Sequence, residues 1–164
     1  GLFTVIYATK VLLIDEIAWG FLLAFLPITT ILLALPMGKL VDKIKRKGPI
    51  LVATLVFGLA MWLFVNGDLP RVAAALILLG AGQVMMNAAF GALQTDLTPR
   101  VERGKVNGFM NFANYIVMAA GSFAGGVLYD HVYPQAPFWL AIACVPISFT
   151  LMLILVKEPE QREE

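Results

Sequence analysis

Two apolar stretches of the sequence carry side-chain amides at helical spacing. The amides are Gln83 and Asn87 in the stretch 72–95, and Asn111 and Asn114 in the stretch 106–129. Steps of three and four residues place such side chains on one face of a helix. An amide without a partner is costly in lipid, so each face should meet protein or water. The amides can bond packed helices to one another or line a solute cavity, and both interpretations stay open.

Other kinds of chemistry are poorly represented. The chain holds one cysteine, Cys144, and one histidine, His131. A disulfide within the chain needs two cysteines, and Cys/His metal sites need a cluster of such residues. The acidic residues all lie near the ends of the apolar stretches, so a proton-coupling carboxylate is expected outside this chain. We therefore expect no enzyme, no metal site, no cofactor and no nucleic-acid partner.

Two short polar segments suggest a conformational role. The first is the segment 38–47, which contains Gly38, Asp42, Lys43, Arg46 and Lys47. A carboxylate such as that of Asp42, at a helix end beside a basic cluster, can cap the positive N-terminus of a neighbouring helix or pair with Arg or Lys. Contacts that form in one conformation and break in another bias which conformation is populated. The segment therefore predicts a gate. The second segment contains Asp96, Pro99, Arg103 and Gly104.

The elements that carry these residues are predicted to be membrane-spanning helices. Of the 164 residues, 60% are hydrophobic and only 14% are charged, and the mean hydropathy is +0.83. A soluble fold of this size could not bury so much apolar surface. A stretch of about 20 apolar residues spans the hydrocarbon core as a helix, the form that satisfies its own backbone groups in lipid. The predicted spans are 17–37, 49–65, 72–95, 106–129 and 136–156.

The charges between the spans predict the orientation. Ten of the twelve basic residues lie in the segments 39–47 and 96–105 and in the tail 157–164. The opposite side has only Lys10 and Arg71. Because cytoplasmic loops are enriched in Lys and Arg, the tail and these two segments are expected in the cytoplasm. Residues 1–14 are apolar but too short to span, and we interpret them as a truncated transmembrane helix.

An internal repeat appears when the sequence is shifted by 88 residues. Gly20-Phe21 then falls on Gly108-Phe109, and Pro49 falls on Pro137. Gly38, Leu40 and Asp42 fall on Gly126, Leu128 and Asp130. Chance matches in a sequence rich in Gly and Leu are one explanation. The other is a three-helix unit used twice, and because three is odd, the second copy would be inverted in the membrane.

The segment 38–47, Gly-Lys-Leu-Val-Asp-Lys-Ile-Lys-Arg-Lys, resembles the signature loop G-x-L-x-D-R-x-G-R-K of the major facilitator superfamily. Gly38, Leu40, Asp42, Arg46 and Lys47 match it, Lys43 replaces Arg, and Lys45 departs from the usual Gly. The segment Asp96-x-x-Pro99-x-x-x-Arg103-Gly104 resembles the loop between the fourth and fifth helices of each half. The resemblance covers nearly the whole chain. It implies an all-α polytopic fold, the six-helix C-terminal half of a twelve-helix bundle from the end of helix 7 through helix 12, with an inverted 3+3 repeat.

Transport of a small solute by alternating access is the function that this resemblance implies. A coupling ion, the lipid bilayer and a missing N-terminal six-helix half would be the other partners. A receptor or scaffold that kept the fold without transporting is the alternative, and solute flux separates the two. Gln83 and Asn111 lie nearest mid-membrane depth or slightly to the cytoplasmic side, so they are the strongest candidates for solute contact. The plasma membrane, the inner membrane of a cell, is the expected location.

Overall fold

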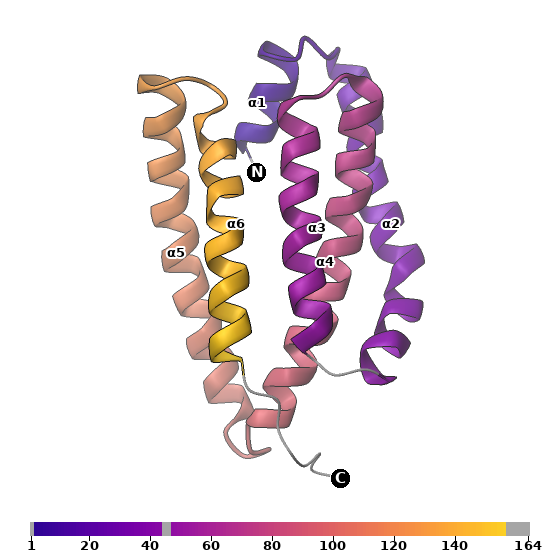
Figure 1. Cartoon of the computed structure of the whole chain (residues 1–164), viewed down its shortest axis with the longest axis vertical. Coiled ribbons are helices and arrows are strands. Elements are labelled where there is room, and N and C mark those ends of the chain that lie inside the picture. The colour runs from indigo at the N-terminus through magenta and orange to yellow at the C-terminus, as the bar shows by residue number, and fades with distance from the viewer. Residues whose placement is uncertain (1, 44–46, 157–164) are drawn as a thin grey trace.

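The computed structural model of the chain describes residues 2–43 and 47–156, and this part is built from α-helices joined by short turns. The helices are α1 (Leu2–Lys10), α2 (Glu16–Lys43), α3 (Lys47–Val65), α4 (Leu69–Leu97), α5 (Arg103–His131) and α6 (Ala136–Leu155). They run side by side as a bundle, with α5 at one edge and α2 at the other (Figure 1). The all-α fold class predicted from the sequence is confirmed.

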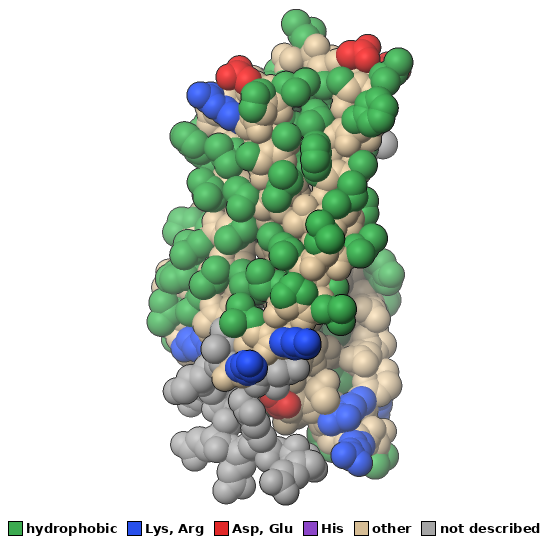
Figure 2. All heavy atoms as spheres, turned by 90° about the vertical axis from the view of Figure 1, so that its right-hand side faces the viewer, with side chains coloured by type: hydrophobic (Ala, Val, Ile, Leu, Met, Phe, Trp, Pro, Cys, Tyr) green, Lys and Arg blue, Asp and Glu red, His purple; other side chains and the backbone are tan. Residues whose placement is uncertain are grey.

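Five of the described helices, α2 to α6, are long and apolar enough to cross a membrane. On the face drawn in Figure 2, apolar side chains cover the middle of the bundle and charged side chains gather at its two ends. The directions of the helices place Asp15 and Asp68 at one end and Lys43 and Lys105 at the other; we call these the Asp68 end and the Lys43 end. A band of apolar side chains between two charged ends is the surface that a bilayer requires.

The helix α2 continues well past the apolar stretch that predicts it. That stretch ends at residue 37, whereas α2 ends at Lys43, so Gly38 lies within a helix and not in a loop. The cause is tertiary packing: Val41 is buried against Ile50 of α3 and Ala89 of α4. Residues 44–46 of the predicted loop, Arg46 among them, lie outside the described residues.

Prolines occur inside α2 and α6, where each removes a backbone hydrogen-bond donor. Threonine hydroxyls nearby donate to carbonyls of the preceding turn, Thr30 to Leu26 at 2.9 Å and Thr150 to Pro146 at 2.8 Å. Such bonds to the carbonyl four residues earlier satisfy the hydroxyl groups of Thr30 and Thr150 within the helix, where lipid offers no water.

The helix α4 is the centre of the bundle because glycines let two neighbours approach its backbone. A Cβ atom placed on Gly80 would lie 2.9 Å from the carbonyl oxygen of Leu26 in α2. A Cβ atom on Gly82 would lie 3.3 Å from a methyl group of Val56 in α3. Small residues are what membrane helices use to bring their backbones close together, so α2, α3 and α4 form one tightly packed layer.

The remaining two long helices, α5 and α6, differ in how closely they pack on the rest of the bundle. The antiparallel helices α3 and α6 meet at Gly58, where a Cβ atom would lie 3.0 Å from a methyl group of Val145. The helix α5 contacts mainly α6, and no residue of α5 is buried. The packed part of the bundle therefore runs from α2 through α4 and α3 to α6, with α5 at its edge.

An aromatic cluster closes the bundle near the Asp68 end. Tyr7 of α1 is 1% exposed, and its ring centroid lies 4.8 Å from that of Phe138 in α6 and 5.7 Å from that of Phe64 in α3. Trp19 of α2 adds an edge contact to Phe64 with centroids 6.2 Å apart. The short helix α1 is thus held between α2, α3 and α6 by aromatic packing, which is worth more than its area alone.

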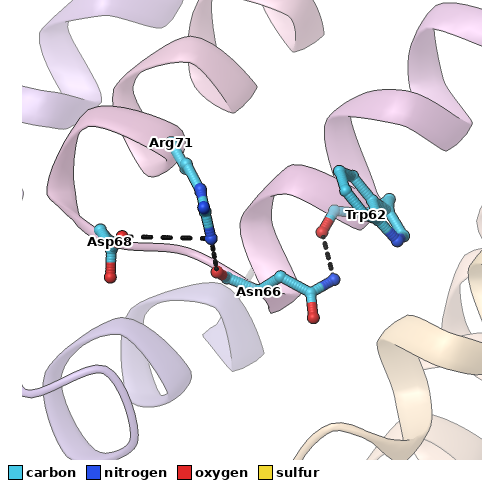
Figure 3. A network of polar contacts seen from close by, with 4 residues as sticks. All are labelled: Trp62, Asn66, Asp68 and Arg71. Atoms are coloured by element: carbon cyan, nitrogen blue, oxygen red, sulfur yellow. Dashed lines mark hydrogen bonds and ion pairs between the residues drawn. The ribbon is translucent and has the colours of Figure 1, made fainter.

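Arg71, one of the two basic residues outside the predicted cytoplasmic segments, lies in the first turn of α4 and contacts the turn between α3 and α4. The guanidinium group of Arg71 donates to the carbonyl oxygen of Asn66 at 3.1 Å and lies 4.0 Å from the carboxylate of Asp68 (Figure 3). The side chain of Asn66 in turn donates to the carbonyl oxygen of Trp62 at 2.9 Å. These contacts satisfy backbone groups at the end of α3, so Arg71 has a local structural role.

Candidate functional site

The largest cavity that we describe lies between four helices, beside the aromatic cluster and toward the Lys43 end. Its volume is about 470 Å³, and α2, α3, α4 and α6 all contribute to its wall. The lining residues are Leu26, Ala53, Thr54, Phe57, Leu79, Gly82, Gln83, Met86, Asn87, Ser148 and Met152. A volume of this size falls within the range of small-molecule sites.

Two of the four amides predicted from the sequence lie in this wall. Gln83 and Asn87 are one turn apart on α4, and both are exposed. Gly82 sits beside Gln83 and brings α3 close to α4, so the amides stand next to a close helix contact. The hydroxyl group of Thr54, on the facing helix, is already donated to the carbonyl oxygen of Ile50 at 2.9 Å.

The chemistry of the wall is neutral and mainly apolar. Its polar side chains are amides and hydroxyls, and no ionisable residue is among those that line it. Amides can donate and accept hydrogen bonds, while Phe57, Met86 and Met152 offer polarisable apolar contacts. The wall can thus hold an uncharged polar group at Gln83 and Asn87 and apolar groups around it. It has no side chain suited to moving a proton in the physiological pH range.

The other two predicted amides are not part of this cavity. Asn111 and Asn114 lie on α5, and both are exposed. Bulky apolar side chains on the same helix, such as Phe112 and Tyr115, are exposed as well. The described helices therefore do not bring the two amide pairs together, and a solute role for Asn111 and Asn114 stays a prediction.

A second groove separates α5 from α6. It has a volume of about 390 Å³ and is lined on α5 by residues such as Met118 and Gly121, and on α6 by residues such as Leu140 and Cys144. A Cβ atom on Gly121 would meet no heavy atom within 4 Å, so this glycine does not mark a close helix contact within the described residues. The loose α5–α6 contact leaves the amide-bearing helix with much of its surface open.

The Lys43 end holds the predicted gating segment. The ammonium group of Lys47, the first residue of α3, donates to the carbonyl oxygen of Leu153 in the last turn of α6 at 2.6 Å. Lys43 ends α2 and is exposed, whereas the structure does not describe the side chain of Asp42. Lys47 belongs to the segment predicted to form a gate, but nothing in the sequence signals an acceptor 106 positions away.

The second predicted segment forms the turn between α4 and α5. Arg103 donates to the carbonyl oxygens of Thr98 at 3.2 Å and Thr95 at 3.1 Å, near the C-terminus of α4. A cation at a helix C-terminus is favoured by the helix dipole and satisfies carbonyls that lack a partner. Pro99 begins the turn, with its carbonyl oxygen accepting from the amide of Glu102 at 3.0 Å. Asp96 lies within α4, and Gly104 is the second residue of α5.

Metal-binding groups of at least three His, Cys, Asp or Glu side chains do not occur among the described residues. The site therefore consists of the neutral cavity wall and the two cationic contacts at the Lys43 end.

Comparison with known proteins gives this architecture a context. The chain is 26% identical over 148 residues to "Multidrug resistance protein 1" of Bacillus subtilis, an alignment that covers 90% of this chain and 38% of that protein. It is 28% identical over 123 residues to "Vacuolar membrane amino acid uptake transporter fnx2" of Schizosaccharomyces pombe, covering 74% of this chain and 21% of that protein. The chain thus spans well under half the length of these relatives.

A family-wide comparison is broader than these pairwise ones. The family model described as Major Facilitator Superfamily matches residues 1–164, the full extent of the sequence. That match agrees with an all-helical bundle that has five described helices able to cross a membrane. On these grounds the chain belongs to the major facilitator superfamily.

Proposed function

We propose that the full-length protein moves a small solute across a membrane by alternating access, and that this chain supplies part of the wall of the pathway. The observation that carries the proposal is the cavity wall at Gln83 and Asn87 on α4, set inside an apolar helical bundle. Amides in such surroundings are costly unless they have a partner, and a solute can be that partner.

The chemistry of the wall supports a substrate class. Neutral amides beside Phe57 and two methionines favour an amphipathic molecule whose polar group at this wall is uncharged. The relatives named for multidrug resistance and for amino acid uptake agree with a small organic solute. Any charged group of the solute, and any coupling ion, would be met by residues outside this wall.

Solute flux tests the proposal directly. The full-length protein is reconstituted into vesicles, and uptake of radiolabelled solutes is measured under imposed proton, sodium and solute gradients. Flux above that of empty vesicles supports transport. If ligands bind but no solute moves under any gradient, the protein is a receptor or scaffold that has kept the fold, and the proposal is wrong.

The proposed orientation places the Lys43 end and the C-terminal tail in the cytoplasm, because most basic residues lie there. Lys43 and Asp68 are exposed at opposite ends of the bundle and suit a labelling test. In a Cys144→Ala background of the full-length protein, with any other cysteines also replaced, we expect Asp68→Cys to react with an impermeant maleimide in intact cells. Lys43→Cys should react only after the cells are opened. The reverse pattern would overturn the orientation.

The gating role of the segment 38–47 gives a further prediction. Asp42 lies in the last turn of α2 at the Lys43 end, next to Val41, which packs with Ala89 just past the amide wall. Capping or ion-pair contacts of such a carboxylate are worth roughly 0.3–2 kcal/mol, so Asp42→Asn should shift the ratio of inward-open to outward-open protein by up to about thirtyfold. We expect the transport rate to fall while equilibrium solute binding changes little. Loss of binding with an unchanged rate of conformational exchange would assign Asp42 to the solute site.

A further inference from the structure

The antiparallel helices α3 and α6 are joined at both of their ends as well as at their crossing. At the Lys43 end, Lys47 donates to the carbonyl oxygen of Leu153 at 2.6 Å; we call this the lysine contact. At the Asp68 end, the hydroxyl group of Tyr7 donates to the carbonyl oxygen of Val65, the last residue of α3, at 3.1 Å; we call this the tyrosine contact. Between them, Gly58 meets Val145 at the helix crossing.

The tyrosine contact reaches α6 as well as α3. The ring of Tyr7 packs against Phe138, the third residue of α6, with centroids 4.8 Å apart. Tyr7 therefore connects the end of α3 to the start of α6, just as Lys47 connects the start of α3 to the end of α6. Each contact supplies a donor to a terminal carbonyl, one of the backbone groups that a helix cannot satisfy by itself.

The carbonyl acceptors of the two contacts occupy equivalent positions in the 88-residue repeat, whereas their donors, Lys47 and Tyr7, do not. That shift carries position 47, the donor of the lysine contact, onto position 135, and position 65 onto position 153. The start of α3 thus corresponds to the start of α6, and the carbonyl acceptor at one end corresponds to the acceptor at the other. An antiparallel pair related by an approximate two-fold axis would place its two acceptors in this way.

The lysine contact and the tyrosine contact differ in their chemistry. A lysine in the first turn of α3 is unfavourable for that helix, because the N-terminus already carries partial positive charge. The ammonium group of Lys47 instead reaches the C-terminus of α6, where the partial negative charge of the helix dipole stabilises it. Tyr7 instead is 1% exposed and neutral, and its contact depends on the short helix α1. One contact is therefore an exposed charge-assisted bond and the other is a buried bond sealed by aromatic rings.

We propose that the lysine and tyrosine contacts together prevent α3 and α6 from rocking about the Gly58–Val145 crossing, so that the pair moves as one rigid body. The crossing lies about 16 Å along α3 from Lys47 and about 10 Å from Val65, at 1.5 Å per residue. Because each helix is stiff, a rotation of α6 relative to α3 about this crossing would separate the two helices at both ends at once. Each contact therefore protects the far end of the pair as well as its own end.

Hydrogen–deuterium exchange of the purified full-length protein tests the proposal without any solute. The test variants are Lys47→Met, which removes the cation but keeps a long side chain, and Tyr7→Phe, which removes the hydroxyl group but keeps the ring. In each single variant we expect amide exchange to rise about two- to tenfold in the end turns of α3 and α6 at both membrane surfaces, the range for loss of one hydrogen bond. Lys105→Met and Tyr133→Phe are the matched controls at exposed positions outside the predicted gating segment, and both should exchange like the parent protein.

A rise confined to the end that carries the substitution would overturn the proposal, because the contacts would then be two independent helix caps. The same is true if either control reproduces the remote effect. Lys47→Arg keeps a cation of similar reach and should exchange like the parent protein. If the Tyr7→Phe protein fails to assemble, the remote effect of Lys47→Met and its rescue by Lys47→Arg still decide the matter.

Discussion

Replacing Gly80 with valine is expected to lower the free energy of unfolding of the bundle by about 3 kcal/mol, the upper part of the range for overpacking a tight helix contact. A Cβ atom at this position would lie 2.9 Å from the carbonyl oxygen of Leu26 and 3.0 Å from Cβ of Thr29. The first obstacle is helix backbone, and Thr29 is buried, so neither can move aside without moving α2. Valine adds two further methyl groups, and α2 and α4 must separate to accommodate them.

Gly91→Val provides the matched control on the same helix. No heavy atom lies within 4 Å of a Cβ atom at Gly91, so the substitution should change the free energy of unfolding by less than about 1 kcal/mol. The fraction of monodisperse full-length protein that survives heating in detergent reports the difference, as a size-exclusion profile against temperature. Equal losses for the two variants would mean that Gly80 does not set the distance between α2 and α4.

This pair of glycines illustrates what hydropathy could not predict about the fold. The apolar stretches and the resemblance of the segment 38–47 were enough to predict an all-α membrane bundle. Gly80 and Gly91 look alike in the sequence, because hydropathy records neither the rotation of a helix nor which neighbour it faces. The continuation of α2 to Lys43 has a similar origin, since Val41 is held in the helix by residues of α3 and α4 that are distant in sequence.

The sequence predicted part of the candidate site, as it predicted part of the fold. Helical spacing identified the amide pair of α4, and Gln83 and Asn87 do lie together in a cavity wall. The same reasoning gave Asn111 and Asn114 of α5, but spacing defines a face of a helix without saying what packs on it. Because α5 contacts mainly α6 and buries none of its residues, its amides stay apart from those of α4 among the described residues.

Lys47 shows a further limit of local patterns. Its match to the signature segment indicated a cytoplasmic basic residue, whereas its acceptor belongs to the last turn of α6. Only the antiparallel packing of α3 on α6 brings donor and acceptor together. The repeat was the one sequence feature that related the two helices, and it did so through Pro49 and Pro137, which lie in the first turns of α3 and α6.

Replacing Gln83 with leucine is expected to raise the KM for solute about five- to tenfold while leaving kcat within about twofold. The side chain stands in the cavity wall with Asn87 one turn away, and leucine keeps its approximate size but removes the hydrogen-bonding groups. Loss of one hydrogen bond to an uncharged group costs about 1–1.4 kcal/mol, which corresponds to that change in affinity. A rise in KM at constant kcat is the pattern for lost binding that ground state and transition state share.

Gln94→Leu is the control, because it makes the same change on the same helix outside the cavity. Gln94 is partly buried and lines a separate crevice of about 160 Å³ with Leu97 and Met110, near the Lys43 end. Vesicle flux measured over a range of solute concentrations gives KM and kcat for both variants. A KM that rises equally in both would point to a general change in α4, and a fall in kcat alone for Gln83→Leu would move Gln83 from solute contact to the conformational step. Because the parent protein must first show flux, failure of transport itself would contradict the proposed function and not the assignment of Gln83.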